Sequence, residues 1–120
     1  MIIVNSADVE TVTNPAGDPM TARGPVYMRR LIDAKTTGGF GVSLVTFGPG
    51  ARLNFHTHPV EQILYVTEGK GILATKEEEK IVTPGMVVVI PPGEVHWHGA
   101  TEDSSFTHLA LYKGEPTVVQ

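Results

Sequence analysis

Cysteine is absent from the 120 residues of this chain. Its absence excludes disulfides, thiolate metal sites and a cysteine nucleophile. Strong charge is also missing, because nine basic and 13 acidic residues give a formal net charge of −4 and the basic residues form no run. This charge balance argues against nucleic acid or an anionic membrane as the partner.

Long apolar runs are missing as well. No stretch approaches the roughly 18 consecutive apolar residues that a membrane-spanning helix needs. Residues 1–12 have no basic residue ahead of their short apolar start, which is unlike a secretory signal peptide. We therefore expect a cytoplasmic protein, and the chain length predicts one domain over residues 1–120.

Glycine and proline are frequent, with 13 and nine copies. They separate short apolar segments at intervals of roughly 8–12 residues, a pattern typical of an all-β sandwich or barrel. The segment 86–90, MVVVI, is predicted to be a strand buried on both faces, and the segment 15–25 is either a lid or a strand connection. The predicted strands are 26–32, 41–47, 53–58, 62–68, 72–76, 81–83, 86–90, 95–99 and 106–112.

The five histidines occur in three places: His56 with His58, His96 with His98, and His108 by itself. Residues two apart in a strand point to the same face, so each pair projects together. Neutral imidazole is the commonest protein ligand for first-row metals. A single His-x-His pair is more often solvated or hydrogen-bonded than metal-binding, so the surrounding motif decides.

Residues 50–69 resemble the first motif of the cupin family, with the spacing G-x5-H-x-H-x3-Q-x6-G. Residues 85–96 are similar to the second cupin motif, G-x5-P-x-G-x2-H. The sequence departs from the family at Gln62, where glutamate is usual, and at Ala100, which replaces the closing asparagine of the motif at 85–100. The resemblance implies an all-β jelly-roll barrel, the double-stranded β-helix of antiparallel strands.

The same resemblance implies one divalent metal ion held by His56, His58, Gln62 and His96. The glutamine carbonyl is neutral, so the ion keeps more net charge than it would beside glutamate and is a stronger Lewis acid. We expect manganese, with Fe, Ni, Co or Zn as alternatives. Glu61 lies one residue earlier and points away from the Gln62 face, so only a β-bulge would make it the ligand.

A narrower resemblance involves the strings HTHPVEQ (56–62), GEVHWHGA (93–100) and FTHLAL (106–111). They are similar to small bacterial cupins related to carboxymuconolactone decarboxylase and to manganese-dependent hydroxynitrile lyases, which cleave cyanohydrins to an aldehyde and hydrogen cyanide. The lyases imply a catalytic role for His98 and His108 in proton transfer. The alternatives are a rim or ligand-orienting hydrogen bond for His98 and a packed barrel histidine for His108.

The leading functional hypothesis is a metal-dependent enzyme on a small organic substrate, a carbon–carbon lyase of the hydroxynitrile lyase type. The alternatives are an Fe(II)-dependent dioxygenase using the same ligands and a non-catalytic module that binds metal or a small ligand. We also expect a homodimer, because a small sandwich leaves a sheet edge for a partner to cover. Residues 2–4, IIV, could supply an exchanged strand.

Three other features have simpler interpretations. Trp97 is expected to pack in the core or at an interface. Met20 and Met28 either line the barrel mouth or fill gaps in the core. The acidic run 77–79 is expected at a hairpin tip in solvent, where nothing makes its carboxylates converge on a metal.

Overall fold

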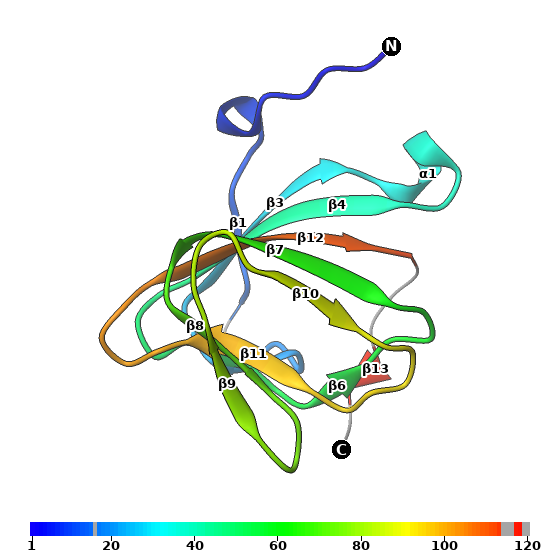
Figure 1. Cartoon of the computed structure of the whole chain (residues 1–120). Helices are drawn as coiled ribbons and strands as arrows, with labels where there is room; N and C mark the ends of the chain where they lie inside the picture. The colour runs from blue at the N-terminus through cyan, green and yellow to red at the C-terminus, as the bar shows by residue number, and fades with distance from the viewer. Residues whose placement is uncertain (16, 114–116, 119–120) are drawn as a thin grey trace.

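The protein is built from two facing antiparallel sheets and one short strand pair, as Figure 1 shows. The computed structural model describes residues 1–15, 17–113 and 117–118. Helix is confined, over these residues, to the single turns η1 (Ser6–Asp8) and α1 (Ala34–Thr37). The six-stranded sheet has the order β1 (Val12–Thr13), β3 (Val26–Ile32), β4 (Gly41–Phe47), β12 (Phe106–Tyr112), β7 (Gln62–Gly69) and β10 (Val87–Ile90). The five-stranded sheet has the order β2 (Thr21–Arg23), β5 (Arg52–Leu53), β11 (Trp97–Ala100), β8 (Gly71–Ala74) and β9 (Glu79–Val82). The third sheet pairs β13 (Thr117–Val118) with β6 (His56–Thr57).

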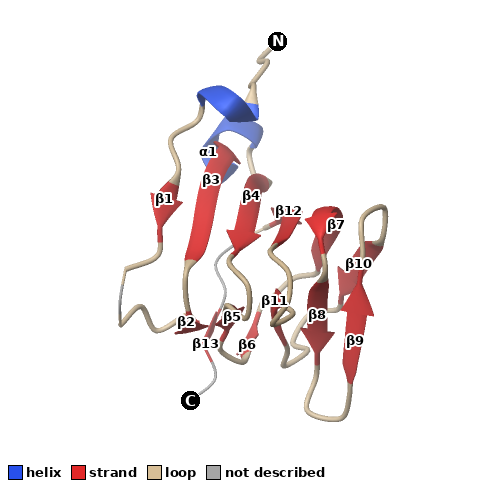
Figure 2. Ribbon diagram, turned by 90° about the vertical axis from the view of Figure 1, so that its left-hand side faces the viewer, coloured by secondary structure: helices blue, strands red, loops and turns tan. Residues whose placement is uncertain are grey.

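The two large sheets face each other as the layers of a jelly roll (Figure 2). Strands β4 and β12 alternate between inward and outward side chains, and their inward residues supply the centre of the core. The rings of Phe47 and Phe106 stack there with centroids 5.7 Å apart, and both side chains are fully buried. The jelly-roll fold expected from the sequence is confirmed.

Three predicted strands, 26–32, 41–47 and 106–112, coincide with β3, β4 and β12. The prediction of one strand over 53–58 is wrong. The chain pairs through β5 with β2 and β11, then turns and pairs through β6 with β13. Asn54 marks the break, because its backbone N–H donates to the Met20 carbonyl and its side chain donates to the Pro19 carbonyl. This break aims the following histidine pair into the barrel.

The prediction that 86–90 is buried on both faces is also wrong. Strand β10 is the last strand of the six-stranded sheet. The side chains on its outer face are exposed to solvent. Val87 is 59% exposed and Val89 is 63% exposed, whereas Ile90 points inward and is buried. A run of apolar residues cannot by itself distinguish a strand covered on both faces from an apolar strand at a sheet edge.

The N-terminal residues extend away from the barrel in Figure 1. Ile2 and Ile3 lie outside any strand and are 66% and 87% exposed. The described part of the segment 15–25 forms a turn and then β2, which joins the five-stranded sheet. It is therefore a strand connection that also lines the cavity through Asp18 and Met20.

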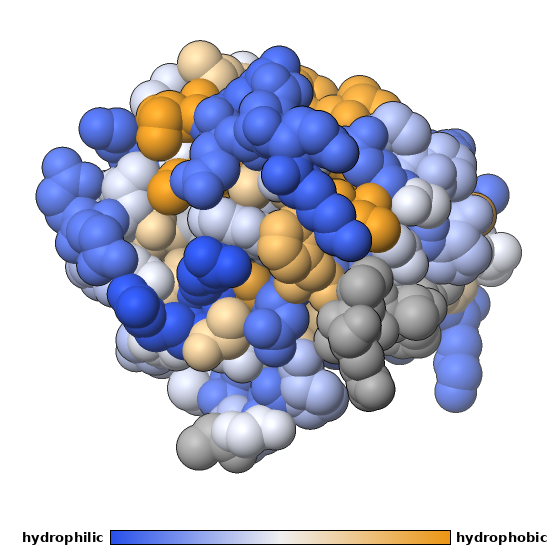
Figure 3. Space-filling model, turned by 90° about the horizontal axis from the view of Figure 1, so that it is seen from below, coloured by the Kyte–Doolittle hydropathy of each residue, from blue (hydrophilic) through white to orange (hydrophobic). Residues whose placement is uncertain are grey.

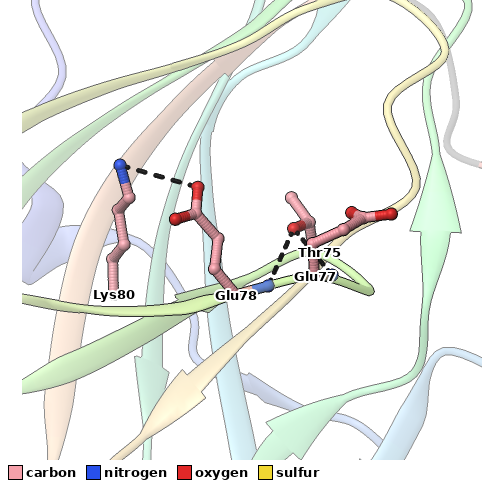
Figure 4. A network of polar contacts seen from close by, with 4 residues as sticks. All are labelled: Thr75, Glu77, Glu78 and Lys80. Atoms are coloured by element: carbon pink, nitrogen blue, oxygen red, sulfur yellow. Dashed lines mark hydrogen bonds and ion pairs between the residues drawn. The ribbon is translucent and has the colours of Figure 1, made fainter.

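The hairpin between β8 and β9 carries the acidic run (Figure 4). The hydroxyl of Thr75 accepts hydrogen bonds from the backbone N–H groups of Glu77 and Glu78, which closes the turn. Glu78 forms an exposed ion pair with Lys80 at 3.6 Å. The run is exposed at the hairpin, as expected.

The surface seen from below is largely hydrophilic, with small apolar patches between the polar residues (Figure 3). None of the helices in the described residues is long and apolar enough to cross a membrane. The expectation of a cytoplasmic location stays a prediction.

Gly69 closes β7 at a point where the chain leaves no room for a side chain. Its φ is +75°, and a Cβ there would collide with the carbonyl oxygen of Ser105. Gly85 has a φ of +93° but open space around it. We expect Gly69→Ala to lower the free energy of unfolding by about 2–5 kcal/mol, since left-handed strain and a backbone clash combine. Gly85→Ala introduces only the left-handed strain and should lower the free energy of unfolding by about 1–2 kcal/mol.

Urea denaturation of the two variants measures the difference. The left-handed strain is common to both positions. The additional loss of unfolding free energy at Gly69 therefore measures the steric clash alone. Equal losses for the two variants would contradict this packing.

Candidate metal centre and cavity

Two of the predicted ligands, His56 and His96, are clamped together by their own backbones. The N–H of His56 donates to the His96 carbonyl at 2.9 Å, and the N–H of His96 donates to the His56 carbonyl at 3.1 Å. This isolated antiparallel bridge joins β6 to the residue just before β11. His58 follows β6 on the same face, and Gln62 begins β7. The predicted ligands thus come from separate segments of the barrel.

The three imidazoles converge in the interior. Potential ligand atoms of His56, His58 and His96 all lie within 4.8 Å of one another. Their ring centroids are 4.3–5.3 Å apart, and the side chains are 0–5% exposed. Gln62 is also buried, whereas Glu61 is exposed. The alternation that places Gln62 inward and Glu61 outward is confirmed.

Backbone carbonyls determine which ring nitrogen of His56 and of His96 carries the proton. Nδ1 of His56 lies 2.8 Å from the Asn54 carbonyl, and Nδ1 of His96 lies 2.9 Å from the Glu94 carbonyl. A carbonyl only accepts, so in the neutral ring Nδ1 carries the proton and Nε2 presents a lone pair. Metal-binding histidines are commonly oriented in this way.

The free atoms of this cluster lack other partners. Nε2 of His56, Nε2 of His96, Nδ1 of His58 and Oε1 of Gln62 are buried and have no hydrogen-bond partner among the described residues. Burying such atoms unpaired is costly, and a metal ion is what this combination of lone pairs satisfies. The three imidazoles therefore fit a divalent ion, and Gln62 lines the same cavity with an amide oxygen of the kind that such an ion accepts.

The cluster is held neutral. Burial, together with the charge of neighbouring imidazoles, lowers the pKa of His56 and of His58 to about 4. Burial also lowers the pKa of His96. Metal ligation requires the neutral imidazole, so these rings are in the ligating form at neutral pH.

The other two histidines form a buried pair beside this cluster. Nδ1 of His98 lies 3.0 Å from Nε2 of His108, a hydrogen bond in which one ring donates to the other. Both rings pack against Phe47 with centroids 5.8 Å away. Burial lowers the pKa of His98 well below its usual value and that of His108 to about 4. The orientation of His98, open from the sequence, is inward.

A cavity of about 460 Å³ connects the two histidine groups. Its walls are largely apolar, and Met20 and Met28 contribute to them while also packing against the core. This volume suits a small organic molecule. Its apolar lining residues include Met20, Val26, Met28, Val45, Leu53 and Ala110.

Ser43 and Tyr112 also line the cavity, and the sequence analysis did not single them out. The sequence could have indicated Ser43, because it is the one hydroxyl residue on the inward face of β4. The other inward residues of that strand are apolar. Trp97 is buried as expected, under the guanidinium of Arg52, which lies 3.9 Å from the ring centroid.

A family model for the cupin domain matches residues 43–112. The chain belongs to the cupin family. This cupin is 51% identical to an (R)-mandelonitrile lyase from Granulicella tundricola over 90 residues, which are 73% of this chain and 68% of the lyase. It is 32% identical to an uncharacterised protein of Acanthamoeba polyphaga mimivirus over 96 residues, 77% of this chain and 57% of the viral protein.

Solved structures agree with the fold of this cupin. A cupin-like protein from Thermotoga maritima has a TM-score of 0.76 and 33% identity, over 83% of this chain and 85% of that one. The polyketide cyclase RemF from Streptomyces resistomycificus has a TM-score of 0.83 at 23% identity, over 100% and 86% of the two chains. At that identity the second likeness concerns the fold alone.

The buried neutral histidines make the metal-free protein sensitive to acid. An unfolded histidine titrates near pH 6.5, whereas His108 in the folded chain has a pKa of about 4. Below pH 6.5 the unfolded chain binds protons that the folded chain cannot, so the free energy of unfolding falls as the pH falls, and this loss ends below about pH 4. We expect His108 to contribute about 1.4 kcal/mol per pH unit between these limits.

Urea denaturation of metal-free protein between pH 5 and 7 checks this slope, in a window where most carboxylates stay ionised. His108→Gln should show a shallower slope than the parent. A stability that does not vary over this window would contradict the burial of neutral imidazoles.

Proposed function

We propose that this cupin is a metal-dependent lyase that cleaves a cyanohydrin into an aldehyde and hydrogen cyanide. The observation that carries the proposal is the neutral His98–His108 pair, which shares one cavity with the unpartnered ligand atoms of the metal cluster. The 51% identity to an (R)-mandelonitrile lyase supports the same reaction.

The residues that would hold the metal are His56, His58, Gln62 and His96. Their unpartnered atoms support this assignment, and the resemblance to manganese-dependent lyases favours Mn²⁺. Such an ion, when bound, supplies Lewis acidity that makes a nearby hydroxyl group easier to deprotonate. Three neutral rings and a neutral amide leave its charge undiminished.

The His98–His108 pair would move the proton. A neutral imidazole with a lowered pKa has a lone pair available near pH 7 and can accept the proton of the cyanohydrin hydroxyl. The oxygen lone pair then forms the carbonyl, the carbon–carbon bond breaks, and its electron pair leaves with cyanide. The imidazolium returns the proton to cyanide, so the products are one aldehyde and one hydrogen cyanide. The 3.0 Å bond between the rings lets the pair share the proton.

The apolar walls suit the remainder of the substrate. A phenyl ring or alkyl group would bury its surface against side chains such as Val45 and Leu53. Exclusion of water by these walls also keeps cyanide beside the protonated pair until it is neutralised.

We expect Mn²⁺-loaded protein to release cyanide from mandelonitrile, measured by a colorimetric cyanide assay. His56→Ala removes a ligand and should abolish the release. His98→Gln and His108→Gln should each lower kcat about 10²-fold or more while the metal content stays unchanged, because positioned acid–base groups typically contribute this much.

The matched control is Tyr27→Phe, which removes a hydroxyl from a 36% exposed ring outside the cavity and should leave the rate unchanged. Release no faster than that of His56→Ala would reject the lyase. Oxygen uptake by Fe(II)-loaded protein with a phenol or diketone would instead favour the dioxygenase, and tight binding without turnover would favour a binding module.

We also propose that the chain forms a homodimer through the outer face of β7 and β10. Ile63, Tyr65, Val87 and Val89 project from that face and are 39–63% exposed. An apolar face next to a sheet edge is a surface that proteins commonly cover with a partner. The exposed residues 2–4 add further apolar surface that a second chain would bury.

Light scattering at micromolar concentration should therefore give twice the chain mass of 12.9 kDa. The double variant Val87→Lys, Val89→Lys places charge in the interface and should give the monomer mass. Lys80→Ala, on the other sheet, is the control and should stay dimeric. A monomeric parent protein would remove the proposal.

A further inference from the structure

Tyr112 lies over a space that a glycine leaves open. At the end of β12 its cross-strand neighbours are Gly41 on β4 and Gln62 on β7. A Cβ on Gly41 would lie 3.0–3.3 Å from Cζ, Cε2 and Oη of Tyr112. The missing side chain therefore makes room for the phenol ring, which lines the cavity next to the proposed fourth metal ligand.

Ser43 meets the phenol from the neighbouring position on β4. Its Oγ lies 3.4 Å from Oη of Tyr112, and its side chain is 1% exposed. The two hydroxyls carry two hydrogens, and the bond between them uses one. One O–H group of the pair thus remains free to donate into the cavity.

Two other kinds of uncharged donor also line the cavity wall. Nδ2 of Asn14 donates to the Thr21 hydroxyl at 3.1 Å, and the histidines and Gln62 belong to the proposed reaction centre. Arg30 lines the cavity but is exposed. The hydroxyl pair, in which Ser43 is buried and Tyr112 half-buried, is therefore a neutral donor beside Gln62 without an assigned acceptor.

We propose that the Ser43–Tyr112 pair binds the nitrile group of the substrate, an inference that rests on the lyase function proposed above. The carbon that reacts in a cyanohydrin carries a hydroxyl, an apolar group and a nitrile. The hydroxyl group gives its proton to the histidine pair, and the apolar group packs against the cavity walls. The nitrile nitrogen is then the one acceptor that still needs a hydrogen-bond donor. Ser43 donates to Oη of Tyr112, and Tyr112 donates to the nitrile nitrogen.

This arrangement also serves the departing group. Negative charge grows on cyanide as the carbon–carbon bond breaks, and a hydrogen bond to a charged acceptor is stronger than one to a neutral acceptor. The Tyr112 hydrogen bond therefore strengthens along the reaction and contributes to kcat as well as to substrate binding.

A pair of isosteric ligands tests the subsite without turnover. Benzonitrile has an acceptor nitrogen, whereas phenylacetylene has the same shape and ends in C–H. Dissociation constants of both are measured by NMR titration of the metal-free protein, for the parent chain, Tyr112→Phe and Ser43→Ala. We expect the parent to prefer benzonitrile and Tyr112→Phe to lower that preference about threefold to tenfold, the value of one hydrogen bond.

Ser43→Ala keeps the donor but removes the group that orients it, so the preference should fall by a smaller factor. Tyr27→Phe, which removes a hydroxyl outside the cavity, should leave the preference at the parent value. With mandelonitrile, Tyr112→Phe should lower kcat more than it raises KM. Folding of each variant is checked by its amide NMR spectrum.

The outcomes separate this proposal from the lyase function. A parent chain that binds neither ligand, or equal preferences in all variants, overturns the subsite even if mandelonitrile is cleaved. A preference that depends on Tyr112 in a protein that releases no cyanide supports the subsite as a nitrile-binding site and rejects the lyase.

Discussion

The reciprocal backbone hydrogen bonds between His56 and His96 are the constraint on which the site depends. They join two chain segments 40 residues apart, and they set the separation of two imidazoles before any metal is present. The carbonyls of Asn54 and Glu94 then fix the ring tautomers, so that both Nε2 atoms face the same point. Histidines arranged by backbone contacts in this way would need little reorganisation to bind an ion, which lowers the entropic cost of binding.

Burial gives the five imidazoles a common electrostatic character, although they fall into two different arrangements. Desolvation keeps every ring neutral near pH 7, which costs stability in acid and leaves nitrogen lone pairs in an apolar cavity. Three rings converge on one point, as ligands do. The other two bind each other, and a hydrogen-bonded pair can hold a proton on either ring. In the proposed lyase the same residue type would thus serve ligation and proton transfer, according to what lies next to it.

The cavity owes its shape to small residues on the inward faces of β4 and β12. Gly41 leaves space for the Tyr112 ring, Ser43 holds its hydroxyl, and Ala110 faces the same cavity without filling it. Larger side chains at these positions would close the space beside Gln62. Since the cupin fold supports many reactions, the residues that shape the cavity distinguish one cupin from another more than the fold does.

Much of this arrangement could be predicted from the sequence, because it follows local rules. Alternation places His56 with His58 and His96 with His98 on shared faces, and it turns Gln62 inward and Glu61 outward; the bounds of β3, β4 and β12 follow from the glycine and proline pattern. The break at Asn54, the exposed face of β10 and the meeting of Ser43 with Tyr112 could not be predicted. Each depends on which strands become neighbours, and contacts between residues distant in sequence are decided only when the two sheets pack.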